Sequence, residues 1–156
     1  MIAHMGIKVK SIMTVLWHSE MSVGNADMDG DHRQLIAALN EFDLLTKRLP
    51  DDRALRAALV ELRDLAIFHF RREEAIQIAC GYPFHAEHAK CHMDLVSDIG
   101  AKAQCFFIDR TEPVTKATLS ETVDFLRHWL LNHMVQFDRP MREFMENLPT
   151  SFRLPE

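Results

Sequence analysis

Four long stretches of the chain carry apolar residues at helical spacing, and every proline lies between or after them. Within these stretches the apolar side chains recur at steps of three and four residues, and no alternating pattern typical of strands competes with them. Asp29 is a residue type that caps helices, and Pro50, Pro140 and the turn at Gly81–Pro83 are stop signals. The sequence therefore predicts helices over residues 30–48, 52–80, 84–108 and 114–138, and a short extra helix over residues 141–148.

The predicted helices are long, and the segments between them are short. Short connections place successive helices side by side and antiparallel, and apolar stripes of this kind pack at shallow crossing angles. A chain of 156 residues is long enough for one domain with a substantial core. We expect an all-α, up-down-up-down antiparallel four-helix bundle over residues 17–148, with an N-terminal arm over residues 1–16 and a C-terminal tail over residues 149–156.

Histidines and a glutamate interrupt the apolar stripes at positions that should face the core. These residues are His69, Glu73, His88, His92 and His133. A buried carboxylate or imidazole is costly unless it is paired or bound to a metal ion. One such histidine alone is more simply explained as a hydrogen-bonded core residue, whereas the whole set favours a metal site.

The histidines are also expected at one height in the bundle, because antiparallel neighbours lie level when they are equally far from their shared turn. His32 precedes the proline between the first two helices by 18 residues, and His69 follows it by 19. At about 1.5 Å per residue, both lie roughly 28 Å from that turn. His92 and His133 are each about twenty residues from the loop at residues 109–113. One layer therefore collects potential ligands from all four helices.

The spacing within the helices agrees with such a layer, with one exception. The pairs that are four residues apart, and so project from one helix face, are His69 with Glu73 and His88 with His92. Asp138 is five residues from His133, which places it off that face in a regular helix. We expect either a π-bulge ahead of Pro140 or an Asp138 side chain that reaches in from the last turn.

The types of side chain in this layer narrow the choice of metal. Imidazole and carboxylate ligands suit iron, manganese or zinc, whereas thiolates would indicate zinc or an iron–sulfur cluster. Cys80, Cys91 and Cys105 show no CxxC spacing, so we interpret them as reduced, partly buried residues outside any metal site.

The motifs that carry these residues resemble the bacteriohemerythrins. The opening WHSEMSVGNADMDGDHRQLIAALN, residues 17–40, leads through Val-Gly and an aspartate to the first histidine. The motifs that follow in the family's order are HFRREE at residues 69–74, GYP at 81–83, HAKCH at 88–92 and WLLNHMVQFD at 129–138. The resemblance covers about residues 17–140, and all seven ligand positions of the family are filled.

This resemblance implies a non-haem di-iron centre that binds molecular oxygen. One iron would be held by three histidines and the second by two, with two carboxylates and an oxo or hydroxo group bridging them. The implied ligands of the first iron are His88, His92 and His133, and those of the second are His32 and His69. The implied bridging carboxylates are Glu73 and Asp138. In the family, oxygen binds at an open position of the second iron. Phe70, Trp129 and Leu130 match positions that line this pocket, with Leu130 over the open position.

Two residues depart from the family pattern. Gln77 stands where the family usually has methionine, one turn beyond Glu73, and we expect its amide to hydrogen-bond to a bound ligand or to admit water. Asp31 replaces the usual glutamine before the first histidine, at a position that we expect to face solvent. His85 lies one turn from His88 and is a candidate for orienting it or a neighbour.

Reversible oxygen binding, in a carrier, store or sensor, competes with other functions. Ferritin-like di-iron enzymes use Glu-x-x-His motifs, and no histidine here has a glutamate three residues before it. Oxygen binding is therefore favoured over a di-iron oxidase, a peroxidase or a nitric-oxide-handling enzyme. A sensor would need a separate protein partner, which the sequence does not identify. The third alternative is a bundle with an accidental histidine layer, or with zinc in place of iron.

Composition narrows the partners and the location. A net charge of −5 without a basic stripe argues against nucleic acid as a partner. No apolar run has the length of a membrane span. The N-terminus has no apolar segment followed by a cleavage site, so we expect a cytoplasmic protein.

Overall fold

The computed structural model describes residues 14–48 and 51–155. The predicted stop at Leu49-Pro50 and most of the predicted arm lie outside the described residues. The described part contains four α-helices and no strand: α1 (Ala26–Lys47), α2 (Asp52–Cys80), α3 (His85–Phe107) and α4 (Lys116–His133). A short 3₁₀ turn, η1 (Ser19–Met21), precedes them, and a π-helical turn, η2 (Met134–Asp138), and a 3₁₀ segment, η3 (Arg139–Asn147), follow α4.

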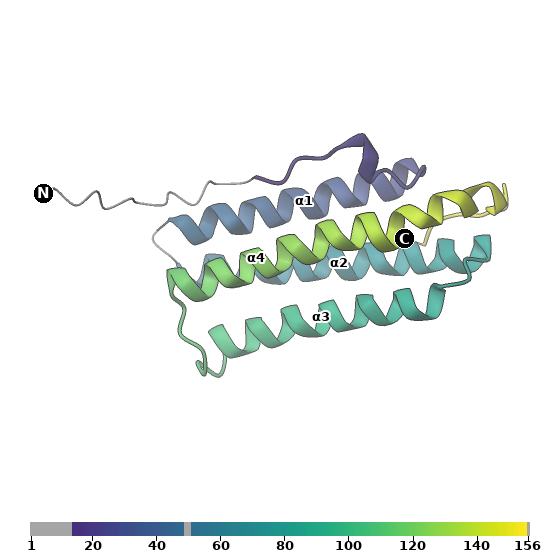
Figure 1. The fold of residues 1–156 in the computed structure, drawn as a ribbon. Coiled ribbons are helices and arrows are strands. Elements are labelled where there is room, and N and C mark those ends of the chain that lie inside the picture. The colour runs from purple at the N-terminus through teal and green to yellow at the C-terminus, as the bar shows by residue number, and fades with distance from the viewer. Residues whose placement is uncertain (1–13, 49–50, 156) are drawn as a thin grey trace, which may run out of the picture.

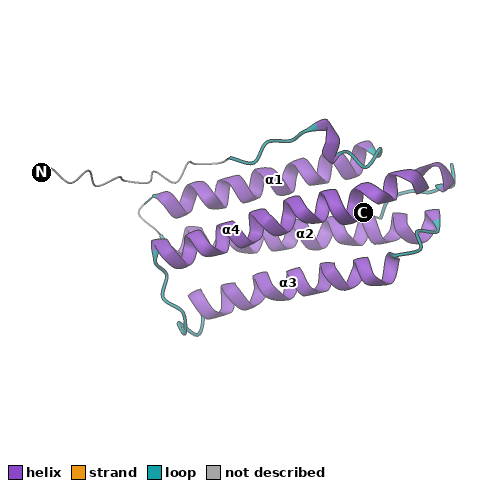
Figure 2. Ribbon diagram, viewed as in Figure 1, coloured by secondary structure: helices purple, strands orange, loops and turns teal. Residues whose placement is uncertain are grey.

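The helices form the predicted up-down-up-down antiparallel bundle (Figure 1). α1 packs against α2 and α4, and α2 also packs against α3. Figure 2 shows that only short loops join the helices in the described residues. Gly81 ends α2 in the left-handed conformation, with a φ of 70° that suits glycine. No helix among the described residues combines the length and apolar character needed to cross a membrane.

The start of α1 differs from the prediction. The helix begins at Ala26, and its cap is Asn25, whose side chain accepts hydrogen bonds from the Asp27 and Met28 amides. The prediction that Asp29 is the cap was therefore wrong. The buried carboxylate of Asp29 instead accepts hydrogen bonds from the Ser22 hydroxyl and the Val23 amide, at 2.6 and 3.0 Å. It ties the incoming segment to the first turn of α1.

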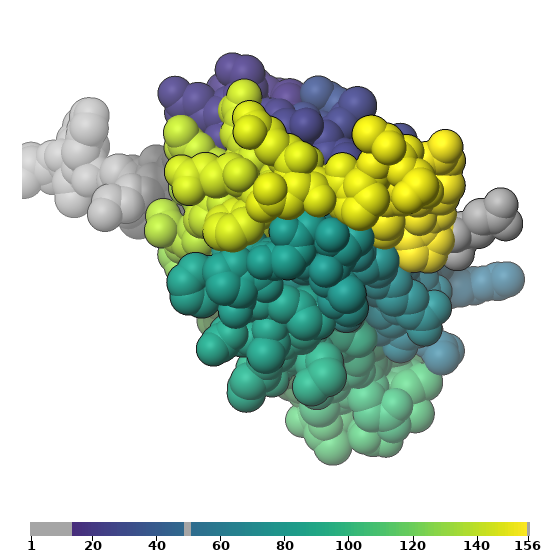
Figure 3. Space-filling view, turned by 90° about the vertical axis from the view of Figure 1, so that its right-hand side faces the viewer, coloured from purple at the N-terminus to yellow at the C-terminus, as the bar shows by residue number. Residues whose placement is uncertain are grey.

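The apolar core consists of two clusters. The larger cluster runs along the bundle and includes Leu35, Ala66 and Leu130. The smaller one lies at the end where α2 turns into α3 and includes Met28 and Met141. Phe144, Phe152 and Leu154 of the C-terminal segment pack on this smaller cluster. That segment lies across the end of the bundle (Figure 3).

Candidate metal centre

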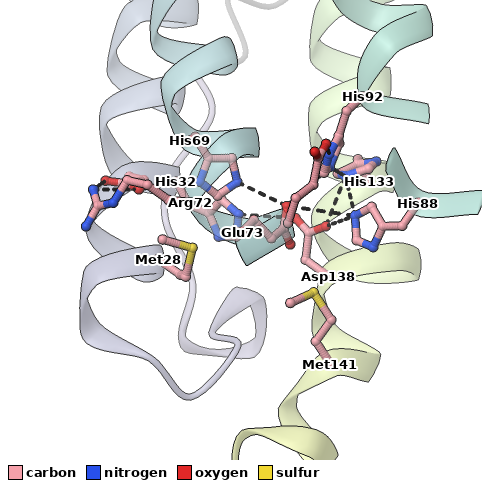
Figure 4. Close-up of polar contacts among 12 residues, drawn as sticks. Met28, His32, His69, Arg72, Glu73, His88, His92, His133, Asp138 and Met141 are labelled. Carbon is pink, nitrogen blue, oxygen red and sulfur yellow. Dashed lines mark hydrogen bonds and ion pairs between the residues drawn. The ribbon is translucent and has the colours of Figure 1, made fainter. Parts of the chain in front are cut away.

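A layer of seven buried histidines and carboxylates lies between the two apolar clusters. Figure 4 shows this layer, with Met28 and Met141 of the smaller cluster on one side of it. Every helix contributes to it, and no member is more than 3% exposed. The members are His32 from α1, His69 and Glu73 from α2, His88 and His92 from α3, His133 from α4 and Asp138 from η2. The structure thus brings together all seven residues that the sequence predicts as ligands.

Three imidazoles converge through the same ring nitrogen. The Nε2 atom of His133 lies 2.9 Å from Nε2 of His88 and 3.0 Å from Nε2 of His92. Three nitrogens bound about 2.1 Å from one six-coordinate ion, at right angles, would lie about 3.0 Å apart. Both observed distances therefore fit imidazole ligands at neighbouring positions around one metal ion.

The two carboxylates each contact imidazoles from both sides of the layer. Asp138 places Oδ1 at 3.0 Å from Nε2 of both His88 and His133, and Oδ2 at 3.1 Å from Nε2 of His32. Oε2 of Glu73 lies 3.2 Å from Nε2 of His92. The same oxygen lies 3.5 Å from Nε2 of His69.

These contacts define two groups of potential ligands. The first group comprises Glu73, His88, His92, His133 and Asp138, and the second comprises His32, His69 and Asp138. Asp138 belongs to both, so it can bridge two ions. The groups are unequal, because the first offers five donors and the second three.

The π-helical turn η2 brings Asp138 into this layer. It spans residues 134–138 directly after His133, so the fourth helix gains one extra residue per turn at this point. The extra residue turns the fifth position after His133 toward the face that His133 itself occupies. Of the two geometries that the sequence left open, the π-bulge is confirmed.

Several polar atoms in the layer have no hydrogen bond among the described residues. They are both ring nitrogens of His32 and His69, Oε2 of Glu73 and both carboxylate oxygens of Asp138. Some lie at ion-pair distance from each other, as His32 and Asp138 do, but without the geometry of a hydrogen bond. Leaving buried polar groups unpaired costs about 1–3 kcal/mol each, and more where they are charged. Metal ions would satisfy these atoms together.

The electrostatics of the layer also favour cations. Burial would raise the pKa of Asp138, but the neighbouring imidazoles, chiefly His133, hold it well below its usual range. Burial, together with the charge of Asp138, raises the pKa of Glu73. Burial lowers the pKa of His92 to about 3, so this ring is neutral near pH 7, the form that binds metal. Glu73 and Asp138 thus depend on the same neighbouring imidazoles to offset their negative charge. A bound cation would keep both carboxylates ionised.

Aromatic rings hold two of the imidazoles in place. Phe70 stacks on His92 with ring centroids 3.8 Å apart, and Trp129 stacks on His133 with centroids 4.3 Å apart. Phe70 and Trp129 also contact each other edge to face. The rings that the sequence assigns to a pocket therefore lie directly against the ligand layer.

A small apolar cavity of about 20 Å³ lies beside the layer. Its lining residues are Leu35, Leu39, Leu62, Ala66, Leu95, Ile99, Leu126, Trp129 and Leu130. Four of them lie three residues from a histidine of the layer, one on each helix: Leu35, Ala66, Leu95 and Leu130. The cavity has room for about one molecule the size of water, and its walls offer no acid or base.

Three acidic or amide side chains contact the outer nitrogens of the imidazoles. Oε1 of Glu74 lies 2.9 Å from Nδ1 of His92, and the amide of Gln77 lies 2.9 Å from Nδ1 of His88. Oδ2 of Asp31 lies 3.6 Å from Nδ1 of His69. Such outer partners orient metal-binding histidines. This role of Glu74 was not predicted from the sequence.

Two expectations about these residues need correction. Asp31 does not face solvent: it is buried, and both of its oxygens accept from Nη1 of Arg72 in α2, at 2.8 and 2.9 Å. Of the residues expected at the oxygen pocket, Trp129 and Leu130 line the apolar cavity, whereas Phe70 and Gln77 do not. Gln77 contacts the outer side of His88, and His85 contacts Gln77 in turn.

Comparison with known proteins agrees with this geometry. The family model described as the hemerythrin HHE cation binding domain matches residues 23–141. A bacteriohemerythrin of Clostridium acetobutylicum is 27% identical over 127 residues, which cover 80% of this chain and 95% of the relative. A hemerythrin-like protein of Naegleria gruberi is 27% identical over 120 residues, covering 76% and 82%.

A more distant relative and a solved structure point the same way. A myohemerythrin of Riftia pachyptila is 24% identical over 123 residues, covering 79% of this chain and 87% of the relative. A crystal structure of wild-type hemerythrin superposes with a TM-score of 0.74 at 22% identity, covering 85% of this chain and 98% of that chain, and shows the same fold. The family match includes every residue of the buried layer and confirms the resemblance seen in the motifs: the chain belongs to the hemerythrin HHE cation-binding domain family.

Proposed function

We propose that this protein binds molecular oxygen reversibly at a non-haem di-iron centre in the buried layer. The observation that carries the proposal is the pair of unequal ligand groups, joined by one carboxylate, in a layer walled by apolar side chains. We assign His88, His92 and His133 to one iron and His32 and His69 to the other, with Glu73, Asp138 and an oxo or hydroxo group as bridges. When bound, the iron pair supplies two electrons and an open position for a diatomic ligand.

The inequality of the two groups supports ligand binding at one iron in particular. The group around His32 and His69 contributes two imidazoles and shares its carboxylates with the other group. Six-coordinate iron at the larger group would be nearly filled by protein atoms, whereas iron at the smaller group would not. An open coordination position is what a ligand-binding metal site needs and a closed structural site lacks.

The apolar cavity supports a small, uncharged ligand. Leu130 and Trp129 line it, and its nearest walls lie one turn from the histidine layer on every helix. Apolar cavities of this kind stay dry, so they favour oxygen over water. With no acid or base in the lining, no side chain stands ready to donate the protons that oxygen reduction would consume. This surrounding suits reversible binding better than the alternative of a di-iron oxidase, a peroxidase or a nitric-oxide-handling enzyme. The cytoplasmic location stays a prediction.

The direct test is to reconstitute the protein with Fe²⁺ without air, measure its metal content and then expose it to oxygen. We expect about two irons per chain, a visible absorption band on oxygenation, and loss of that band on degassing. Oxidation that degassing does not reverse would instead support the enzyme alternative. One zinc, or no metal, after purification and reconstitution would rule out the di-iron centre.

Replacing Leu130 by alanine tests the role of the cavity. Leu130 is 7% exposed, so its truncation opens the cavity to solvent. The oxygenated form should then decay faster on standing in air, which repeated absorption spectra measure. The variant should also lose about 2–5 kcal/mol of stability, as buried Leu→Ala changes do. Leu119→Ala is the matched control, because Leu119 is also buried in α4 but lies eleven residues away. Equal decay in both variants would contradict a local role for Leu130.

A further inference from the structure

Gln77 is completely buried between two histidines of α3, one turn beyond Glu73 in α2. Its Nε2 lies 2.9 Å from Nδ1 of His88 and 3.3 Å from the sulfur of Met141. Its Oε1 lies 2.9 Å from Nδ1 of His85. A buried amide with three polar contacts is specified by its surroundings and does more than fill space.

The polarity of these contacts assigns the protons on both histidine rings. Nε2 of an amide only donates, so Nδ1 of His88 accepts, and a neutral His88 carries its proton on Nε2. That Nε2 lies 3.0 Å from Oδ1 of Asp138, inside the ligand layer. Oε1 of Gln77 only accepts, so Nδ1 of His85 donates to it.

A metal ion on Nε2 of His88 requires the opposite polarity. A neutral imidazole that binds metal through Nε2 carries its proton on Nδ1, which then needs an acceptor. Gln77 can supply that acceptor by turning its amide over, so that Oε1 faces His88. Its Nε2 then faces His85, whose Nδ1 must accept. Neither ring changes its charge: one proton moves from Nε2 to Nδ1 in His88, and one from Nδ1 to Nε2 in His85.

We propose that Gln77 is the positioning residue for His88, and that its amide turns over when a metal ion binds to Nε2 of His88. In the loaded state the chain His88–Gln77–His85 fixes the tautomer that aims Nε2 of His88 at the metal. His85 is only half-buried, so its Nε2 proton can be hydrated by solvent.

This inference rests on the proposed metal centre, and the first arm of its test uses Zn²⁺ as a diamagnetic probe. In protein labelled with ¹⁵N-histidine, we expect zinc loading to move the proton of His88 from Nε2 to Nδ1, and that of His85 from Nδ1 to Nε2. The position of the proton on each ring is read from the ¹⁵N chemical shifts and couplings of that ring. A His85 ring that keeps its proton on Nδ1 after loading would overturn the proposal, and this arm needs no variant.

The second arm compares two substitutions. Their ranking in zinc affinity distinguishes a positioning role of Gln77 from a packing role. Gln77→Glu keeps an acceptor for Nδ1–H of His88, whereas Gln77→Met keeps the volume and loses the acceptor. We expect zinc affinity, measured against a competing chelator, to fall about 10–100-fold in Gln77→Met and to be largely retained in Gln77→Glu. If the amide only fills space, methionine will be harmless and glutamate the worse change.

Gln104→Met is the matched control, because Gln104 is an exposed glutamine of α3 whose amide bonds to Asp109. It should bind zinc as the unmodified protein does. If the unmodified protein fails to bind two metal ions, the proposed function itself fails. If it binds two and Gln77→Met binds them equally tightly, only the role of Gln77 fails.

Discussion

Asp138→Ala is expected to bind at most one iron per chain, and to bind it at least 100-fold more weakly than the unmodified protein. Asp138 is the one residue that belongs to both ligand groups, with Oδ1 toward His88 and His133 and Oδ2 toward His32. Without it, the smaller group keeps His32 and His69, and Glu73 is the one proposed bridge that remains. Loss of an outer partner alone typically costs 10–100-fold in metal affinity, so loss of a direct bridging ligand exceeds that range.

The measurement is the iron content of the protein after anaerobic reconstitution and removal of unbound metal. Asp98→Ala is the control, because Asp98 is an exposed carboxylate of α3, and it should still bind about two irons. Asp138→Asn adds a sharper comparison, since it keeps the shape of the side chain and one oxygen but removes the charge. Retention of two tightly bound irons by Asp138→Ala would show that the π-helical turn does not serve the metal centre.

The height of the ligands could be predicted because it depends only on local geometry. Helical rise and the positions of the turns place His32 level with His69 and His92 level with His133, whatever the details of packing. The bounds of α2 follow from its flanking Asp51 and Gly81 in the same way, because both signals are local. The π-bulge could be predicted only as one of two geometries, because an aspartate five positions on could also have reached in from the last turn.

Contacts between helices could not be predicted in this way. Asp31 is buried because Arg72 reaches it from the neighbouring helix, 41 positions along the chain. Glu74 points away from the face of Glu73, yet it meets Nδ1 of His92 because α3 lies on that side. Gln77 lies on the ligand side of α2 but meets the outer nitrogen of His88. Each of these contacts depends on how two helices are rotated about their axes and placed side by side. The spacing of apolar residues defines the rotation of a helix only approximately.

The polar layer and the apolar packing are separate parts of the bundle. Apolar clusters lie on both sides of it, so the bundle is stabilised independently of the polar residues. Within the described part of the chain, several atoms of the polar residues lack a hydrogen bond, which is costly for buried groups. If the proposed metal centre satisfies them, the stability of the protein will depend on metal.

Loading both sites is therefore expected to raise the melting temperature by about 10–20 °C. A ligand that binds only the native state, at a free concentration 100 times its dissociation constant, contributes about 2.7 kcal/mol per site, or roughly 5 kcal/mol for two. A domain of this size shifts by about 2–4 °C per kcal/mol. The physical source is the set of ring nitrogens and carboxylate oxygens that lack a hydrogen bond in the described structure. The measurement is thermal unfolding followed by circular dichroism without air, with Fe²⁺ or with excess chelator.

The same melt in Asp138→Ala separates specific binding from a general effect of the ion. Because that variant has lost the shared bridge, Fe²⁺ should raise its melting temperature by no more than a few degrees. A shift as large as in the unmodified protein would mean that the metal acts elsewhere on the chain. A shift near zero in both proteins would mean that Fe²⁺ does not bind the native state in preference to the unfolded state. The unpaired atoms of the layer would then be satisfied without metal.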